Sequence, residues 1–145
     1  LDRKIITDYG NDSPIYLLGF SMGGIICRYW LQHFSGAISR TKRFISIGSP
    51  HRGTLTAQFI PLCLLKGVAE MKRGSLLLEQ LNKDCSPLEG VECFSFYCFW
   101  DLMVLPGWEA ILPLGKSYKL PVLTHKALIF NQRAIDIIIS ESLNS

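Results

Sequence analysis

The run from Ile15 to Phe34 joins a short apolar segment to a helical one through a turn rich in glycine. The segment Ile15 to Phe20 is bounded by chain-breaking residues, which is typical of a strand buried on both faces. From Gly23 to Phe34 the apolar side chains repeat at helical spacing, which predicts an amphipathic helix. Between them stands GFSMG, residues 19–23, so a strand must turn into a helix within a few residues. Small residues suit such a bend because neighbouring backbone passes close to it.

The rest of the chain alternates predicted strands with predicted helices. Strands are predicted at Arg43 to Gly48, Val91 to Trp100 and Lys119 to Leu123, helices at Leu1 to Tyr9 and Phe130 to Leu143, and loops at Asp84 to Gly90 and Asp101 to Gly115. The apolar region Leu55 to Leu81 is broken by glycines and is predicted to form two short helices. This alternation indicates the α/β class, with a mostly parallel sheet flanked by helices. Residues 1–145 are predicted to belong to a single domain.

Composition narrows the class of protein further. Hydrophobic residues make up 48% of the 145 residues, which argues against disorder, and the net charge of +3 is too small and too scattered for a nucleic-acid surface. No apolar stretch reaches the roughly 18 residues of a membrane helix. The five cysteines lack a Cys-x-x-Cys pair, so no zinc site is expected and a reducing, cytoplasmic compartment fits. Because Leu1 already stands in a helical pattern, we expect the natural chain to start further upstream.

The glycine-rich turn also carries a candidate nucleophile, Ser21. In a bend this tight the central residue is held in a strained conformation that lifts its side chain clear of the sheet. The backbone N–H of Met22 would then face a developing oxyanion at the positive end of the helix. The alternative is that Ser21 is only a helix cap, in a turn that uses glycine for its shape.

Three stretches resemble the α/β-hydrolase superfamily: GFSMGG at residues 19–24, the helix ICRYWLQ at 26–32, and ISIGSPHRGT at 45–54. They are similar to the lipase and esterase branch, whose members carry a Gly-His-Ser-Met-Gly-Gly turn and a Thr-Pro-His-x-Gly-Thr loop. Phe20 stands where that branch commonly has histidine, at a position that tolerates variation. The resemblance covers nearly the whole chain and implies the C-terminal part of this fold, with the early strands missing. It also implies a serine hydrolase without metal or cofactor, whose second oxyanion donor belongs to an earlier loop outside this sequence.

Three histidines are candidates for the base that activates Ser21. His33 lies about 18 Å from the serine by helical rise, which is too far. No acidic residue lies between Ser21 and His51, whereas the chain order in this fold is serine, acid, histidine, so the order is wrong for His51. The resemblance implies that His51 belongs to a structural loop beside the pocket. His125 follows the last predicted strand, where the resemblance places the catalytic histidine, and the alternative is a loop histidine without a role.

Asp101 is the best candidate for the acid that orients His125. It directly follows the Val91 to Trp100 strand, and FWDLMVLP resembles the family's pattern of an acid followed by an apolar pair and a proline. Asp84 precedes that strand, and Glu92 falls at its start, on the opposite edge of the sheet. In the implied mechanism the serine attacks the acyl carbonyl, the histidine moves the proton, and the aspartate orients the histidine.

We therefore expect a carboxylic ester hydrolase of the lipase or esterase type, acting on a small-molecule or lipid ester through an acyl-enzyme. The Leu55 to Leu81 region sits where lipases often place a lid or a pocket wall, and ordinary helix packing is an equal interpretation. Acyl transfer on the same residues, and a truncated chain that only binds an apolar ligand or partner, stay open as alternatives. Transient contact with a membrane surface would suit a lipid substrate, and nucleic acid is not an expected partner.

Overall fold

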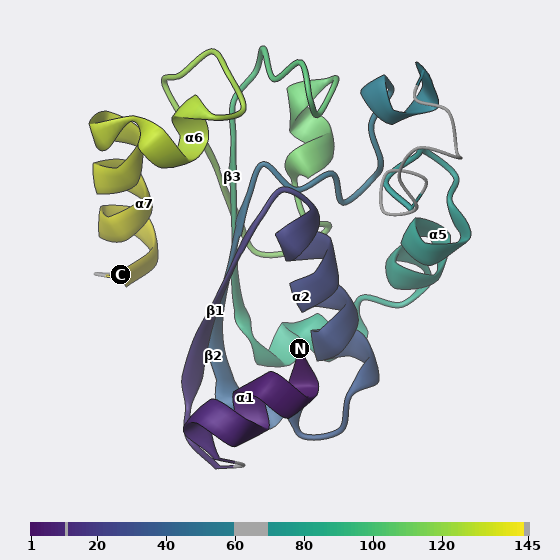
Figure 1. Cartoon of the computed structure of the whole chain (residues 1–145), viewed down its shortest axis with the longest axis vertical. Helices are drawn as coiled ribbons and strands as arrows, with labels where there is room; N and C mark the ends of the chain where they lie inside the picture. The colour runs from purple at the N-terminus through teal and green to yellow at the C-terminus, as the bar shows by residue number, and fades with distance from the viewer. Residues whose placement is uncertain (11, 60–69, 144–145) are drawn as a thin grey trace.

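Four parallel strands form the centre of the protein, and helices cover both faces of the sheet (Figure 1). The computed structural model describes residues 1–10, 12–59 and 70–143. The strands are β1 (Ile15–Phe20), β2 (Thr41–Ile47), β3 (Glu92–Tyr97) and β4 (Lys116–Lys119), and they lie in that order across the sheet. Each neighbouring pair is parallel, which confirms the predicted α/β class.

Two apolar cores lie on the two faces of the sheet because successive strand residues point to opposite sides. Phe44 and Cys93 belong to the core beside α1 and α2, whereas the next residues, Ile45 and Phe94, belong to the core beside α6 and α7. The helices are α1 (Asp2–Tyr9), α2 (Met22–His33), α3 (Ala37–Arg40), α5 (Leu76–Lys83), α6 (Ala127–Phe130) and α7 (Gln132–Leu143). Figure 1 shows α6 and α7 on one side of the sheet, and α2 and α5 on the other.

The prediction that Ile15 to Phe20 is buried on both faces is wrong. Tyr16 and Leu18, on one face of β1, are 58% and 56% exposed. The reason is that β1 lies at the edge of the described sheet, and α7 packs over β2 and β3 and only borders β1. Leu18 consequently lines a shallow hollow beside α7 instead of the core.

The fourth strand was predicted at Lys119 to Leu123 and is instead β4, Lys116–Lys119. The prediction followed the apolar side chains of Leu120 and Val122, which are indeed buried against α6 and α7. They reach that core from a loop, however, because Pro121 between them has no N–H to give to a sheet. Burial of apolar residues was predicted correctly here, but their secondary structure was not.

Most of the other predicted helices, strands and loops are confirmed. The predicted terminal helices are α1 and α7, and the Val91 to Trp100 strand is β3, which ends at Tyr97. The two predicted loops each contain a 3-10 turn, η2 (Ser86–Gly90) and η3 (Gly107–Ala110). Of the Leu55 to Leu81 region the structure describes η1 (Thr56–Phe59) and most of α5, and residues 60–69 lie outside the described residues.

Within the described ranges no helix is long and apolar enough to cross a bilayer. The cysteines of those ranges, Cys27, Cys85, Cys93 and Cys98, are free thiols. Burial raises the pKa of Cys93 to about 12 and that of Cys98 to about 11, with the nearby Asp101 carboxylate adding to the second shift. These two thiols are therefore protonated and unreactive in the folded protein.

Candidate active site

Ser21 stands alone between the end of β1 and the start of α2, in a strained backbone conformation. Its φ of 54° makes it the single non-glycine residue of positive φ in the part of the chain that the structure describes. The Ser21 N–H donates to the carbonyl oxygen of Ile47 at 2.9 Å, which ties the turn to the end of β2. The Ser21 hydroxyl makes no capping hydrogen bond to α2. Ser21 thus occupies the N-cap position of α2, but its hydroxyl group does not act as the cap.

Close contacts, with backbone at Gly19 and with a side chain at Gly24, explain two of the glycines around this turn. A Cβ atom at Gly19 would lie 2.5 Å from Gly24 Cα, and one at Gly24 would lie 2.1 Å from Ser49 Oγ. Neither position therefore has room for a side chain. Gly23 differs, because a Cβ atom there would meet nothing within 4 Å. The requirement for a small residue thus holds for the first glycine of the GFSMG pattern and for Gly24, but not for Gly23.

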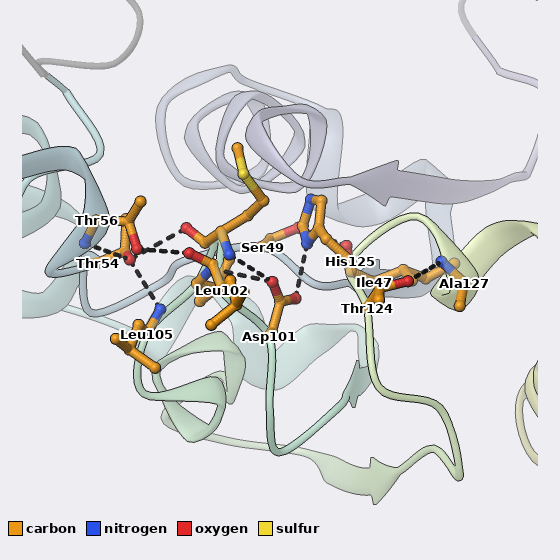
Figure 2. A network of polar contacts seen from close by, with 12 residues as sticks. Ile47, Ser49, Thr54, Thr56, Asp101, Leu102, Leu105, Thr124, His125 and Ala127 are labelled. Carbon is orange, nitrogen blue, oxygen red and sulfur yellow. Dashed lines mark hydrogen bonds and ion pairs between the residues drawn. The ribbon is translucent and has the colours of Figure 1, made fainter.

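Asp101 and His125 are paired at the carboxyl ends of the strands (Figure 2). His125 Nδ1 lies 2.7 Å from Asp101 Oδ2, and the carboxylate is almost fully buried. The other carboxylate oxygen, Oδ1, accepts hydrogen bonds from the backbone N–H groups of Met103 at 2.9 Å and Val104 at 3.1 Å. With Nδ1 donating to the carboxylate, His125 Nε2 carries the free lone pair that a general base needs.

His125 also lies beside the serine turn. Its ring packs against Phe20, the residue before the serine, with ring centroids 4.7 Å apart. Gly48, the residue after β2, also lies close to the imidazole ring: a Cβ atom there would be 3.0 Å from His125 Cε1. His125 Nε2 is buried and has no hydrogen-bond partner among the described residues. His51 Nδ1 is unpaired in the same way, so the unpaired Nε2 of His125 gains its meaning from its place beside the serine turn.

The two other histidines are held in different surroundings. His33 is exposed at the end of α2, stacks on Tyr29 at 4.3 Å, and its Nδ1 lies 3.0 Å from the Tyr29 carbonyl oxygen. His51 is fully buried, with Nε2 2.6 Å from Ser46 Oγ. Burial, and secondarily the Arg28 guanidinium, hold the pKa of His51 well below 6.5. His51 is therefore neutral at physiological pH and bound inside the protein, as a structural residue.

The competing acids also have partners elsewhere. Asp84 is exposed and accepts hydrogen bonds from the Ser86 N–H and hydroxyl, which lower the pKa of Asp84. Glu92 lies at the start of β3 and forms ion pairs with Arg43 at 2.9 Å and Lys116 at 3.7 Å. Only Asp101, of the three acids considered, bonds to a histidine in the described structure.

Two apolar hollows flank the serine turn. One of about 590 Å³ lies between α2 and α5 and includes Met22, the residue after the serine. Its other apolar lining residues are Ile25, Ile26, Tyr29, Met71, Leu76 and Leu77, and Glu70 and Gln80 add polar groups. The other, of about 320 Å³, lies against His125, between the loop after Asp101 and the loop that precedes α6; its lining includes Leu102, Met103 and Leu123. The loop residues of the second hollow were missed in the sequence, although the apolar run LMVL after Asp101 was a signal for them.

No cluster of His, Cys, Asp and Glu suited to a metal ion occurs within the described ranges. The paired groups at the site are one carboxylate and one imidazole, beside a hydroxyl and the N-terminal end of a helix. This set can perform nucleophilic acyl transfer, with the imidazole as the proton carrier.

Comparison with solved structures supports the α/β-hydrolase fold. The lipase BlEst2 from Bacillus licheniformis, in its mature form, aligns at a TM-score of 0.74 and 16% identity, over 96% of this chain and 69% of that one. Phospholipase PlaB from Legionella pneumophila aligns at 0.68 and 16%, over 94% and 44%. A hydrolase from Pseudomonas aeruginosa aligns at 0.58 and 14%, over 99% and 70%. At these identities the likeness concerns the fold, which is the one that the sequence motifs implied.

Comparison at the level of sequence identifies the family. No curated protein matches the chain. A family model described as palmitoyl protein thioesterase matches residues 3–89, which include the whole of the serine turn and the SPHRGT loop. Since this match spans more than half of the chain, the protein belongs to the palmitoyl protein thioesterase family.

Proposed function

We propose that this protein is a serine hydrolase that cleaves acyl esters, with Ser21 as nucleophile, His125 as base and Asp101 as the acid that orients the base. One observation carries the proposal: a buried Asp101–His125 pair, whose Nε2 has no partner among the described residues, lies beside a serine held at positive φ. Membership of a thioesterase family supports the same class of reaction.

The proposed reaction uses these groups in two half-reactions. Ser21 Oγ bonds to the acyl carbonyl carbon while His125 Nε2 takes the hydroxyl proton, and the carbonyl electron pair moves onto oxygen, towards the Met22 N–H. The intermediate then collapses, and the leaving alcohol or thiol departs with the proton from His125. Water repeats the sequence on the acyl-enzyme, so the products are a carboxylic acid and free Ser21. Asp101 accepts the Nδ1–H bond throughout and stabilises the imidazolium.

The two hollows support an acyl lipid as the substrate. Because His125 must return its proton to the leaving group, the hollow that His125 lines suits the leaving group. The larger hollow includes Met22, on the oxyanion side, and its size falls within the roughly 300–1,000 Å³ of typical ligand pockets. Its mostly apolar lining suits the acyl chain. Exposed Trp100, Leu102 and Leu123 add apolar surface around the site, as a lipid substrate requires.

A fatty acyl thioester is a second candidate substrate, favoured by the family to which the chain belongs. The same three residues serve both reactions, since only the leaving atom changes from oxygen to sulfur. Hydrolysis rates of para-nitrophenyl esters and of acyl thioesters with equal acyl chains would compare the two. We expect kcat/KM to rise with acyl length in both series if the larger hollow binds the chain.

Intact-mass labelling with a fluorophosphonate tests the mechanism. We expect one adduct on the protein and none on Ser21→Ala, whose folding is checked by circular dichroism. Labelling or para-nitrophenyl ester hydrolysis that persists in Ser21→Ala would contradict the proposal. Acyl transfer, the alternative on the same residues, is separated by product analysis with a competing alcohol: an ester product in place of free acid would indicate transfer.

A further inference from the structure

We propose that Thr54 is a positioning residue for the catalytic acid, because its hydroxyl group holds the backbone segment whose N–H groups orient Asp101. The proposal rests on the proposed function. Thr54 ends the SPHRGT stretch, lies on the loop that follows β2, and is 3% exposed. It is distant in sequence from the acid loop, residues 101–105, and it touches neither His125 nor Ser21 through any hydrogen bond of the described structure.

The Thr54 hydroxyl makes three hydrogen bonds, two of them to the acid loop (Figure 2). Oγ1 donates to the carbonyl oxygen of Met103 at 3.1 Å and accepts from the N–H of Leu105 at 2.9 Å. It also accepts from the N–H of Thr56 at 3.2 Å. A hydroxyl group offers one proton and two lone pairs, so Thr54 uses its full capacity here.

These bonds act on Asp101 through the residues between. Met103 donates its N–H to Asp101 Oδ1 and accepts the Thr54 hydroxyl at its carbonyl, so the residue is held from both sides. Val104 gives the second N–H to Oδ1 and lies directly before Leu105, which Thr54 also holds. With Oδ1 occupied in this way, Oδ2 is left facing His125 Nδ1. The orientation of the carboxylate therefore depends on the path of residues 102–105.

Thr54 is itself fixed by contacts outside the acid loop. Its N–H donates to the Met71 carbonyl oxygen at 3.0 Å. Two neighbours add parallel links to the loop: Leu55 N–H donates to the Leu105 carbonyl at 3.0 Å, and Thr56 Oγ1 donates to the Leu102 carbonyl at 2.7 Å. Residues 54–56 thus hold the acid loop through several hydrogen bonds. Loss of the Thr54 hydroxyl would leave Met103 C=O and Leu105 N–H without their partner, which favours a shift of the loop.

The test compares Thr54→Val, which keeps the shape and removes the hydroxyl, with Thr54→Ser, which keeps the hydroxyl. Thr41→Val is the matched control. Thr41 is also buried and also spends its hydroxyl on a backbone carbonyl, that of Ala37 at 2.7 Å, but it lies at the opposite end of β2. Two readouts are taken on each folded variant: the fluorophosphonate labelling rate, and the downfield proton resonance of His125 Nδ1–H, assigned by its loss in His125→Gln.

We expect Thr54→Val to label about 10- to 100-fold more slowly, the scale of a misplaced catalytic group, and to lose or shift the Nδ1–H resonance. Thr54→Ser and Thr41→Val should retain both. The proposal is overturned if Thr54→Val labels at the wild-type rate with an unchanged resonance, or if it differs from Thr41→Val in neither readout. If the wild-type protein does not label at all, the proposed function fails, and the resonance still decides whether Thr54 positions the Asp101–His125 pair.

Discussion

The turn that carries Ser21 and the loop that carries Asp101 are held in place by different kinds of contact. At the turn, backbone and side chains approach so closely that Gly19 and Gly24 have no space for a Cβ atom. At the acid loop, hydrogen bonds from Thr54 and Thr56 hold residues 102–105. Close packing at Gly19 and Gly24, with one backbone hydrogen bond from Ser21 to Ile47, fixes the nucleophile, whereas polar contacts hold the acid.

This difference determines how each part of the site responds to substitution. A sterically fixed turn fails when an atom is added, and it fails by unfolding, because the contacts lie between main elements of the fold. A hydrogen-bonded loop fails when a polar group is removed, and it can lose its geometry while the rest of the protein stays folded. Substitutions at the two places should therefore separate activity from stability.

The largest effect is expected from Asp101→Asn, which alters the loop side of the site. The amide oxygen can still accept from Met103 and Val104, so the fold should be retained. The amide NH₂ would then face His125 Nδ1, which forces the proton onto Nε2 and removes the base. We expect ester hydrolysis to fall by about 10⁴-fold, as for this change in other triads. Steady-state kinetics with a para-nitrophenyl ester would measure the loss.

Asp84→Asn provides the matched control for that experiment. Asp84 is the competing acid of the sequence, and its carboxylate caps Ser86 on the surface. Its substitution should leave the hydrolysis rate unchanged. A large loss in Asp84→Asn, or hydrolysis at the wild-type rate in Asp101→Asn, would show that the acid has been assigned wrongly.

The same contrast explains which parts of the structure were predictable from sequence. The serine turn was predictable because its glycines are adjacent in sequence to the strand and helix that they join. The periodicities of those two elements are local signals. The support of Asp101 by Thr54 was not predictable from sequence. Thr54 meets the acid loop only after parallel pairing of β2 and β3 has brought together the loops that follow these strands. The SPHRGT stretch was recognised through a resemblance, but no local pattern assigns its threonine a role.

Strand β4 and the exposure of β1 were mispredicted for a related reason. The apolar residues Leu120 and Val122 are buried in either a strand or a loop, so burial alone does not determine the secondary structure. Likewise, the apolar run of β1 gives no information on how far α7 extends over the sheet, and Tyr16 and Leu18 are left uncovered. The β1 error concerns tertiary placement, which composition and spacing do not encode, whereas Pro121 was a local signal against a strand at Lys119 to Leu123.

Two glycine substitutions test whether close packing holds the serine turn in place. In Gly24→Ala the new Cβ atom would lie 2.1 Å from Ser49 Oγ and 2.7 Å from Ser49 Cβ, and Ser49 is fully buried. We expect a loss of about 3 kcal/mol in the free energy of unfolding, the upper part of the usual range for overpacking. Urea denaturation would measure it.

Gly23→Ala is the control, at the preceding position of the same helix. Because a Cβ atom there meets nothing within 4 Å, alanine should stabilise α2 by about 0.5 kcal/mol through its higher helix propensity. If both alanine variants lost the same stability, the effect would lie in the helix start as a whole and not in the contact between Gly24 and Ser49.

A smaller effect than that of Gly24→Ala is expected from Ser21→Gly, and it has the opposite sign. A non-glycine residue at a φ of 54° stores about 1–3 kcal/mol of strain, which glycine would release. Part of that gain is lost because glycine is more flexible in the unfolded chain, so we expect a net stabilisation of about 1 kcal/mol, measured as a rise of the melting temperature by roughly 3 °C. Ser21→Ala keeps the Cβ atom and hence the strain, so it should melt close to the wild type. Equal melting temperatures for the glycine and alanine variants would mean that the turn stores no strain at Ser21. A gain confined to Ser21→Gly would show that the position is kept, at a cost in stability, for the hydroxyl group that the proposed reaction needs.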